Sequence, residues 1–218
     1  MAKTAIIFGS TGLVGSALLK ILLQSKKYDI IKAFVRKPFS FSNDKLQQII
    51  IDFDQPESFG DQITGDDIYL CLGTTMKKAG SKDAFYKIDY TYTMQAATSA
   101  AKNKVKKLCL ISSLGADVSS AVYYSKVKGD VERDISALGF DTIHIVRPSL
   151  LLGNRKENRV GERIGIILSR MLSFLFIGPL KKYKAIQDIT VASAMFQLMQ
   201  ADTKGTFIHE SIDLQKFG

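Results

Sequence analysis

The sequence predicts an α/β fold in which a doubly wound parallel sheet carries helices on both faces. Short segments that are apolar on both faces recur along the chain, as in strands that a sheet buries on both sides. Segments with helical periodicity separate these strands. A third observation is the glycine-rich stretch at residues 9–15, which joins the first strand-like segment to the first helical one.

The first half of the chain supplies three expected strands and one helix. Apolar runs at residues 4–10, 30–36 and 46–53 predict strands, since β-branched and aromatic residues dominate them. Residues 12–24 follow the glycines and place their apolar side chains at helical spacing, which predicts a helix. A loop is expected between the second and third strands.

The middle of the chain continues the alternation with strands at residues 67–73, 107–113 and 141–149. Helical patterns at residues 83–102 and 121–138 separate them. After Pro148 the pattern loosens. The elements expected there are a basic loop, a helix at 160–177, the segment "KYKAI", a helix at 188–200 and a short strand at 205–210.

Length and composition indicate one folded domain. The chain has 218 residues, of which 46% are hydrophobic, enough for one sizeable core. It contains no linker-like, low-complexity or repeated stretch. We therefore expect a single domain over residues 1–218, in which residues 149–218 form a small substrate or lid lobe.

Cysteines and histidines are too few and too scattered for a metal site. Cys71 and Cys109 lie inside strand-like apolar runs, which favours core packing. His144 and His209 lack the neighbouring ligands of a zinc or iron site. No metal is expected.

The net charge of +9 favours an anionic ligand, but the basic clusters are dispersed and no nucleic-acid motif accompanies them. No specific nucleic-acid partner is expected.

The first residues lack a signal-peptide core, which predicts a cytoplasmic protein. The apolar window at residues 164–180 has Arg170 at its centre and is too interrupted to span a bilayer. A surface or pocket-lid helix is favoured there over interfacial membrane contact.

The glycine loop predicts dinucleotide binding. Glycine permits the tight turn, the approach of backbone N–H groups to a pyrophosphate and close helix packing, while the helix N-terminus favours the anion. The alternative is a merely structural turn. The residues expected to bind the cofactor here are Gly9, Ser10, Thr11, Gly12, Leu13, Val14 and Gly15.

The end of the second strand distinguishes the two nicotinamide dinucleotides. An acid there would bind a ribose 2′-hydroxyl, whereas Arg36 and Lys37 suit a 2′-phosphate, so NADP(H) is favoured. The alternative is that both are ordinary surface charges. Further cofactor candidates follow the third and fourth strands, where open α/β sheets bind ligands. They are Asp52, Phe53, Gly73, Thr74 and Thr75.

Tyr124 and Lys128 lie four residues apart and therefore on one face of a helix, downstream of Ser112 and Ser113 at the end of a strand. Tyr28 and Lys32 have the same spacing, but no serine precedes them at a strand edge. We interpret the Tyr28 pair as coincidental and the Tyr124 pair as functional.

The motifs "GSTGLVG", Ser-Ser…Tyr-x-x-x-Lys and "RPSLLLG" resemble the short-chain dehydrogenase/reductase superfamily. Within it, "CLGTTMKKAGS", "SSLGAD" and "RPSLLLGNRKENRVGER" resemble the atypical branch typified by the Tat-interacting oxidoreductase. The resemblance implies an NADP-binding Rossmann fold with Ser113, Tyr124 and Lys128 at the reductase positions and Ser112 as the alternative serine. Tyr124, Lys128, Arg147 and Pro148 are also counted among the cofactor-binding residues.

Two functions follow as hypotheses. In the first, the protein reduces a small or medium carbonyl compound with NADPH. Tyr124 would protonate the alkoxide, Ser113 would donate a hydrogen bond to it, and Lys128 would hold the nicotinamide ribose and lower the tyrosine pKa from about 10. In the second, NADP occupancy regulates a protein partner without turnover. In the superfamily that the chain resembles, helices placed as 83–102 and 121–138 often form dimer bundles, so a homodimer is one arrangement that the resemblance allows. The short tail argues against nucleotide-sugar substrates.

Overall fold

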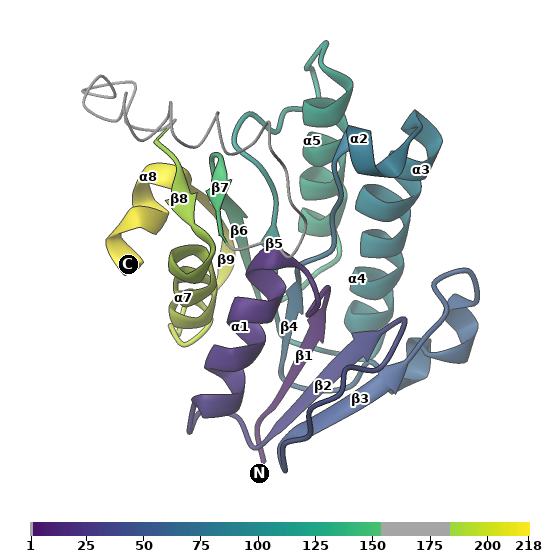
Figure 1. Cartoon of the computed structure of the whole chain (residues 1–218), viewed down its shortest axis with the longest axis vertical. Coiled ribbons are helices and arrows are strands. Elements are labelled where there is room, and N and C mark those ends of the chain that lie inside the picture. Colours follow the sequence, from purple (N-terminus) through teal and green to yellow (C-terminus); the bar gives the residue numbers. More distant parts are fainter. Residues whose placement is uncertain (1, 154–183) are drawn as a thin grey trace.

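A computed structural model describes residues 2–153 and 184–218 of the chain. Its centre is a seven-stranded parallel sheet (Figure 1) with the strand order β3-β2-β1-β4-β5-β6-β9. The strands are β1 (Thr4–Phe8), β2 (Ile30–Val35), β3 (Leu46–Ile50), β4 (Asp67–Leu70), β5 (Lys107–Ile111), β6 (Thr142–Arg147) and β9 (Gly205–Glu210). The predicted parallel α/β sheet is therefore confirmed.

Helices cover both faces of this sheet (Figure 1). On one face lie α1 (Leu13–Gln24) and α7 (Asp188–Leu198), and on the other lie α4 (Tyr92–Lys102) and α5 (Tyr123–Ser136). The reason is visible in β1, where Ile7 packs into one apolar core while Ile6 and Phe8 pack into the other. Strands that are apolar on both faces thus require two helical layers.

Several short elements complete the fold. Short helices and turns are α2 (Met76–Ala79), α3 (Lys82–Tyr86), α8 (Ser211–Leu214) and the 3₁₀ turns Pro56–Ser58, Gly60–Gln62 and Gln215–Phe217. A π-helical turn, Lys87–Thr91, joins α3 to α4, so the helix expected at 83–102 is one rod with a π turn inside it. A small second sheet pairs β7 (Leu151–Leu152) with β8 (Ile186–Gln187). The sequence patterns gave no sign of that pair.

The C-terminal residues are partly built into the main sheet. β9 extends the sheet beside β6, and α7 packs against α1. The basic loop at 155–163, the helix expected at 160–177 and the apolar window at 164–180 lie outside the described residues. A lid formed by residues 149–218 therefore stays a prediction. Among the described helices, none combines the length and the apolar character needed to cross a bilayer.

The strand order reverses at β1. β1 has β2 on one side and β4 on the other, so the chain leaves the sheet after β3 and returns on the far side of β1. Open α/β sheets bind ligands outside the carboxyl ends of the strands at such a reversal. The loops after β1, β2, β4 and β5 all begin at this edge.

Candidate functional site

The glycine loop between β1 and α1 is shaped by close backbone contacts. Gly9 has a φ of +77°, and a Cβ there would lie 2.3 Å from the carbonyl oxygen of Cys71. A Cβ on Gly15 would lie 2.1 Å from the Gly9 oxygen. At Gly12 an added Cβ would meet only the Gly9 oxygen, at 3.2 Å. Gly9 and Gly15 are therefore required by the fold, whereas a side chain at Gly12 would fill space in front of the loop.

The N-terminus of α1 is suited to an anion. Gly12 caps the helix without a side-chain hydrogen bond, and the first turn carries no acidic residue. Its backbone N–H groups and the positive end of the helix dipole thus remain available. The Ser10 hydroxyl is buried and has no hydrogen-bond partner in the described part of the chain. Such an orphaned polar atom fits a site that a polar ligand completes.

Arg36 and Lys37 follow the carboxyl end of β2, which pairs with β1 beside the glycine loop. Both side chains are exposed, and neither forms a hydrogen bond or ion pair with a described residue. The guanidinium of Arg36 can therefore bind an anionic ligand without first breaking an internal contact.

The residues after β3 differ in their availability. Asp52 is exposed, and its carboxylate accepts a hydrogen bond from the Asp54 N–H at 2.9 Å. Phe53 is only 5% exposed and stacks on Tyr92 with ring centroids 4.5 Å apart. Most of the Phe53 ring is thus occupied by core packing. The contact of Phe53 with adenine stays a prediction. The packing of its ring against Tyr92 argues against that contact.

Tyr124 lies in the first turn of α5 with its hydroxyl unengaged by any described residue. Its ring packs against Phe85, with centroids 5.3 Å apart. The hydroxyl of the neighbouring Tyr123 instead donates to the Lys82 carbonyl at 3.2 Å. Of the two adjacent tyrosines, Tyr124 is the one whose phenol can interact with a ligand.

Ser112 and Ser113 follow β5 directly, and the choice between them stays open. The Ser112 hydroxyl is buried and lacks a hydrogen-bond partner among the described residues. The Ser113 hydroxyl has only a long contact of 3.4 Å to the Leu114 carbonyl. Either hydroxyl could therefore turn to a ligand oxygen.

Lys128 lies one helical turn after Tyr124, and its ammonium is buried in an ion pair. Its Nζ is 2.7 Å from Oδ1 of Asp89, and the two side chains are 8% and 0% exposed. Burial alone would lower the pKa of Lys128, but Asp89, helped by Tyr124 and Glu132, outweighs burial and raises it. The lysine is consequently charged in the folded protein.

Asp89 also reaches the loop after β4. Its Oδ2 accepts the Thr74 N–H at 2.8 Å, and a Cβ on Gly73 would lie 3.3 Å from Oδ1 and 3.6 Å from the Lys128 Nζ. The structure thus brings Gly73, Thr74 and Lys128 together. The side chain of Thr75 is used otherwise, since its hydroxyl accepts the Lys78 N–H and caps α2.

Sequence reasoning missed Asp89, although a signal was present. The buried positions of the helical stretch are Phe85, Asp89, Thr93, Ala96, Ala97 and Ala100, which recur at helical spacing. Asp89 is thus an acid on the apolar face of a helix. A charge at such a position needs a buried partner.

Arg147 and Pro148 lie at the end of β6. The guanidinium of Arg147 binds Glu132 through two nitrogens and Glu210 at 3.1 Å. The Pro148 carbonyl accepts the Leu114 N–H at 3.0 Å. These contacts tie β6 to α5, β9 and the loop after β5, so Arg147 has an ordering role in the described structure. Its contact with a cofactor stays a prediction.

The second Tyr-x-x-x-Lys pair has a different environment. Tyr28 is fully buried where β2 begins, at the edge of the sheet away from the glycine loop, and its hydroxyl bonds Asp67 and Tyr69. Burial, together with Asp67, raises the pKa of Tyr28. Lys32 lies within β2 and donates to Thr64. The pair is not on one helix face, in agreement with its interpretation as coincidental.

Histidines and acids do not gather into a larger cluster in the described ranges. His144 Nδ1 lies 3.0 Å from His209 Nε2 between β6 and β9. Within residues 2–153 and 184–218, no three His, Cys, Asp or Glu side chains are grouped so that they could hold a metal ion.

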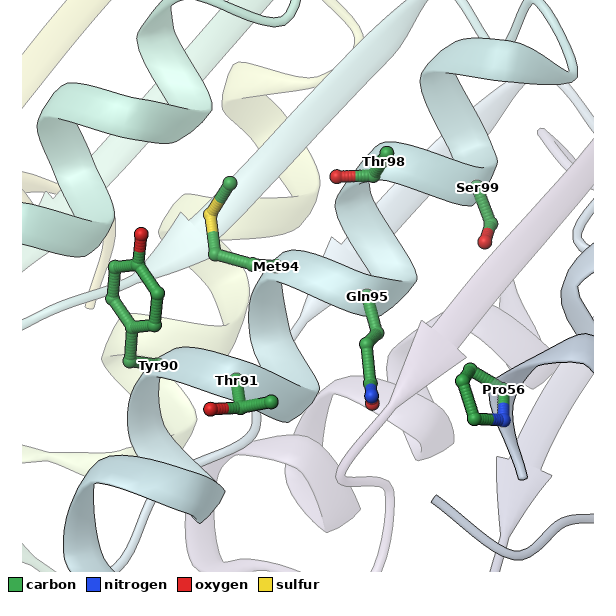
Figure 2. A pocket seen from close by; sticks show the side chains of 7 residues that line it. All are labelled: Pro56, Tyr90, Thr91, Met94, Gln95, Thr98 and Ser99. Carbon is green, nitrogen blue, oxygen red and sulfur yellow. The ribbon is translucent and has the colours of Figure 1, made fainter. Parts of the chain in front are cut away.

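An open depression lies along α4, and Figure 2 shows the side chains that line it. Its lining residues are Pro56, Tyr90, Thr91, Met94, Gln95, Thr98 and Ser99. The Tyr90 hydroxyl donates to Asp134 at 2.7 Å. The lining residues carry no charged side chain, and their one titratable group is this hydroxyl, whose pKa the hydrogen bond to Asp134, with burial, raises to about 12.

Most of the chain is similar to known proteins. A family model described as NAD(P)H-binding matches residues 9–165. Rat Protein HTATIP2 is 35% identical over 164 residues, which cover 73% of this chain and 67% of that protein. Protein FMP52, mitochondrial, from Candida albicans is 37% identical over 172 residues, covering 74% and 75%.

Solved structures agree on the fold. A short chain dehydrogenase family protein from Francisella tularensis superposes with a TM-score of 0.65 at 14% identity, covering 98% of this chain and 99% of that chain. MoeE5 in complex with UDP-glucose and NAD gives a TM-score of 0.69 at 14% identity, covering 94% and 74%. These similarities confirm the predicted Rossmann-like fold.

Proposed function

Because this chain belongs to the NAD(P)H-binding atypical short-chain dehydrogenase/reductase family, we propose that it is an NADP(H)-dependent reductase of a small or medium carbonyl compound. The proposal rests on the arrangement of two residues of α5. Tyr124 has a hydroxyl that no described residue engages, and Lys128, one helical turn further on, is buried and charged. Tyrosine can deliver a proton, and a neighbouring cation favours its ionised form.

The residues at the glycine loop fit a dinucleotide. The uncapped N-terminus of α1, the open face at Gly12 and the orphaned hydroxyl of Ser10 suit a pyrophosphate. Arg36 would bind a ribose 2′-phosphate through two donated hydrogen bonds, which selects NADP(H) over NAD(H). The bound cofactor would supply the hydride. Side chains of the protein would transfer the proton and stabilise the developing charge.

Tyr124 would act on the oxygen of the substrate carbonyl. When the carbonyl carbon is reduced, negative charge develops on that oxygen, and the Tyr124 hydroxyl can transfer its proton there. Ser113, or Ser112 in its place, would donate a hydrogen bond to the same oxygen and stabilise the charge. Lys128 would hold a ribose hydroxyl and make the loss of the tyrosine proton easier.

Reductase activity is tested with matched tyrosine variants. NADPH oxidation is followed over a panel of aldehydes, ketones and quinones. Tyr124→Phe should lose any activity of the wild type, by about a hundredfold or more, while Tyr123→Phe should keep it. Tyr123 is a suitable control because its hydroxyl is already bonded to the Lys82 carbonyl. Equal activity in both variants contradicts the assignment of Tyr124.

A cofactor sensor that binds a protein partner without turnover is the second candidate. It is favoured by exposed apolar side chains in the C-terminal part, Leu150 at 54% and Ile212 at 42%. Wild-type protein that binds NADPH but reduces nothing in the panel supports this candidate. A homodimer, which the resemblance allows, would use α4 and α5, and sedimentation measures it. The cytoplasmic location stays a prediction, and a fluorescent fusion tests it.

A further inference from the structure

The ion pair between Asp89 and Lys128 joins two segments 39 residues apart through groups that are almost completely buried. Asp89 is also held by the loop after β4. Asp89 Oδ2 accepts the Thr74 N–H, and the Gly73 backbone lies against both charged groups. The carboxylate is thus placed between the loop after β4 and the lysine of α5.

Asp89 occupies an irregular part of its helix. The π turn Lys87–Thr91 interrupts the rod between α3 and α4, and Asp89 is the one buried residue within it. π turns are rare and are found frequently at functional sites. This local distortion supports a specific role for the Asp89 side chain.

The charged and titratable groups around Lys128 are few in the described residues. Asp89 comes from the π turn, and Tyr124 and Glu132 come from α5 itself. The Glu132 carboxylate is already bound by Arg147, 2.5 Å away at its nearest nitrogen. The loop after β4 contributes only backbone atoms at Gly73 and Thr74. Asp89 is therefore the acid in direct contact with the ammonium.

We propose that Asp89 is a positioning residue that keeps the buried Lys128 ammonium charged and fixed one turn from Tyr124. A buried ammonium without a counter-ion tends to lose its proton, because burial penalises the charged form. A neutral Lys128 would no longer place a positive charge one helical turn from Tyr124. The importance of Asp89 for catalysis rests on the proposed reductase function, whereas its effect on Lys128 does not.

The test replaces Asp89 by asparagine. The amide oxygen of Asp89→Asn can still accept the Thr74 N–H, so the variant removes the charge and preserves this hydrogen bond. Lysine 13Cε and 15Nζ resonances are followed by NMR from pH 5 to pH 11 in the free protein. The Lys128 resonance is identified by its disappearance in Lys128→Arg.

In the wild type, Lys128 should stay protonated to the alkaline end of the titration. In Asp89→Asn, its midpoint should fall by on the order of three pH units. An unchanged midpoint in the folded variant would overturn the proposal. A purely structural role of Asp89 would not move this titration, provided that circular dichroism shows both proteins folded.

If Asp89→Asn does not fold, the folding of the double variant Asp89→Asn/Lys128→Met is measured instead. Recovery of folding supports the proposal, since the unpaired lysine charge was then the defect. A double variant that is equally unfolded overturns it, because Asp89 would then be needed irrespective of the lysine. NADPH oxidation by the wild type over the carbonyl panel tests the proposed reductase function separately, so failure of one claim can be told from failure of the other.

Discussion

Replacement of Arg36 by alanine should weaken NADPH binding selectively. Arg36 is exposed, follows β2 and makes no ion pair or hydrogen bond with a described residue, so its loss leaves no described partner unpaired. A charge-assisted hydrogen bond contributes about 1.5–3 kcal/mol. At about 1.4 kcal/mol per decade, the dissociation constant for NADPH should rise roughly tenfold to a hundredfold. NADH lacks the 2′-phosphate, so its affinity should change little.

The assay is calorimetric titration of both cofactors into wild type, Arg36→Ala and Lys37→Ala. Lys37 is the neighbouring cation and should account for a smaller loss, because its ammonium cannot form a paired contact. Salt should reduce the difference between the cofactors, since these charges are exposed. A wild type that prefers NADH, or an Arg36→Ala variant that loses affinity for both cofactors equally, would refute the assignment of Arg36 to the 2′-phosphate.

Two further predictions concern stability. Burial, followed by the charges of His209 and Lys107, lowers the pKa of His144 to about 4. Because the folded protein then binds fewer protons than the unfolded chain, the free energy of unfolding should fall by about 2 kcal/mol from pH 7 to pH 5. Urea denaturation measures this loss, which should be smaller in His144→Phe. Tyr28→Phe should destabilise the protein by about 1–3 kcal/mol, since Asp67 loses a buried donor. Its NADPH affinity should remain that of the wild type, and a clear loss would contradict the interpretation of Tyr28 as structural.

The fold could be predicted because its determinants are local. Strands such as Thr4–Phe8 are apolar on both faces, and Gly9, Gly12 and Gly15 follow the first of them at a spacing of three residues. The spacing of Tyr124 and Lys128 likewise fixes their shared helix face. Each of these features can be read from a few neighbouring residues.

Side-chain partners across long sequence distances were not predictable in this way. Asp89 meets Lys128, and Arg147 meets both Glu132 and Glu210, only because the sheet brings their elements together. The stacking of Phe53 on Tyr92 is likewise a contact between distant segments, and the adenine contact of Phe53 stays a prediction. Tertiary packing and the cost of burying an unpaired charge decide which of several available partners a side chain contacts.

The central claim is that the loop from Gly9 to Gly15 holds a dinucleotide, and calorimetric titration of NADPH into Gly12→Val tests it most directly. Gly12 has a φ of −76°, which any residue can adopt, and an added Cβ would meet only one protein atom, at 3.2 Å. Gly60→Val is the matched control, since a Cβ there meets the Ser99 hydroxyl at the same 3.2 Å, far from the loop.

Both variants should fold, as judged by circular dichroism and thermal melting. Gly12→Val should bind NADPH at least about tenfold more weakly than the wild type, a loss of about 1.4 kcal/mol or more, because the valine methyl groups fill the space of the pyrophosphate. Gly60→Val should bind as the wild type does. Unchanged NADPH affinity in folded Gly12→Val, or no NADPH binding by the wild type, would contradict the account.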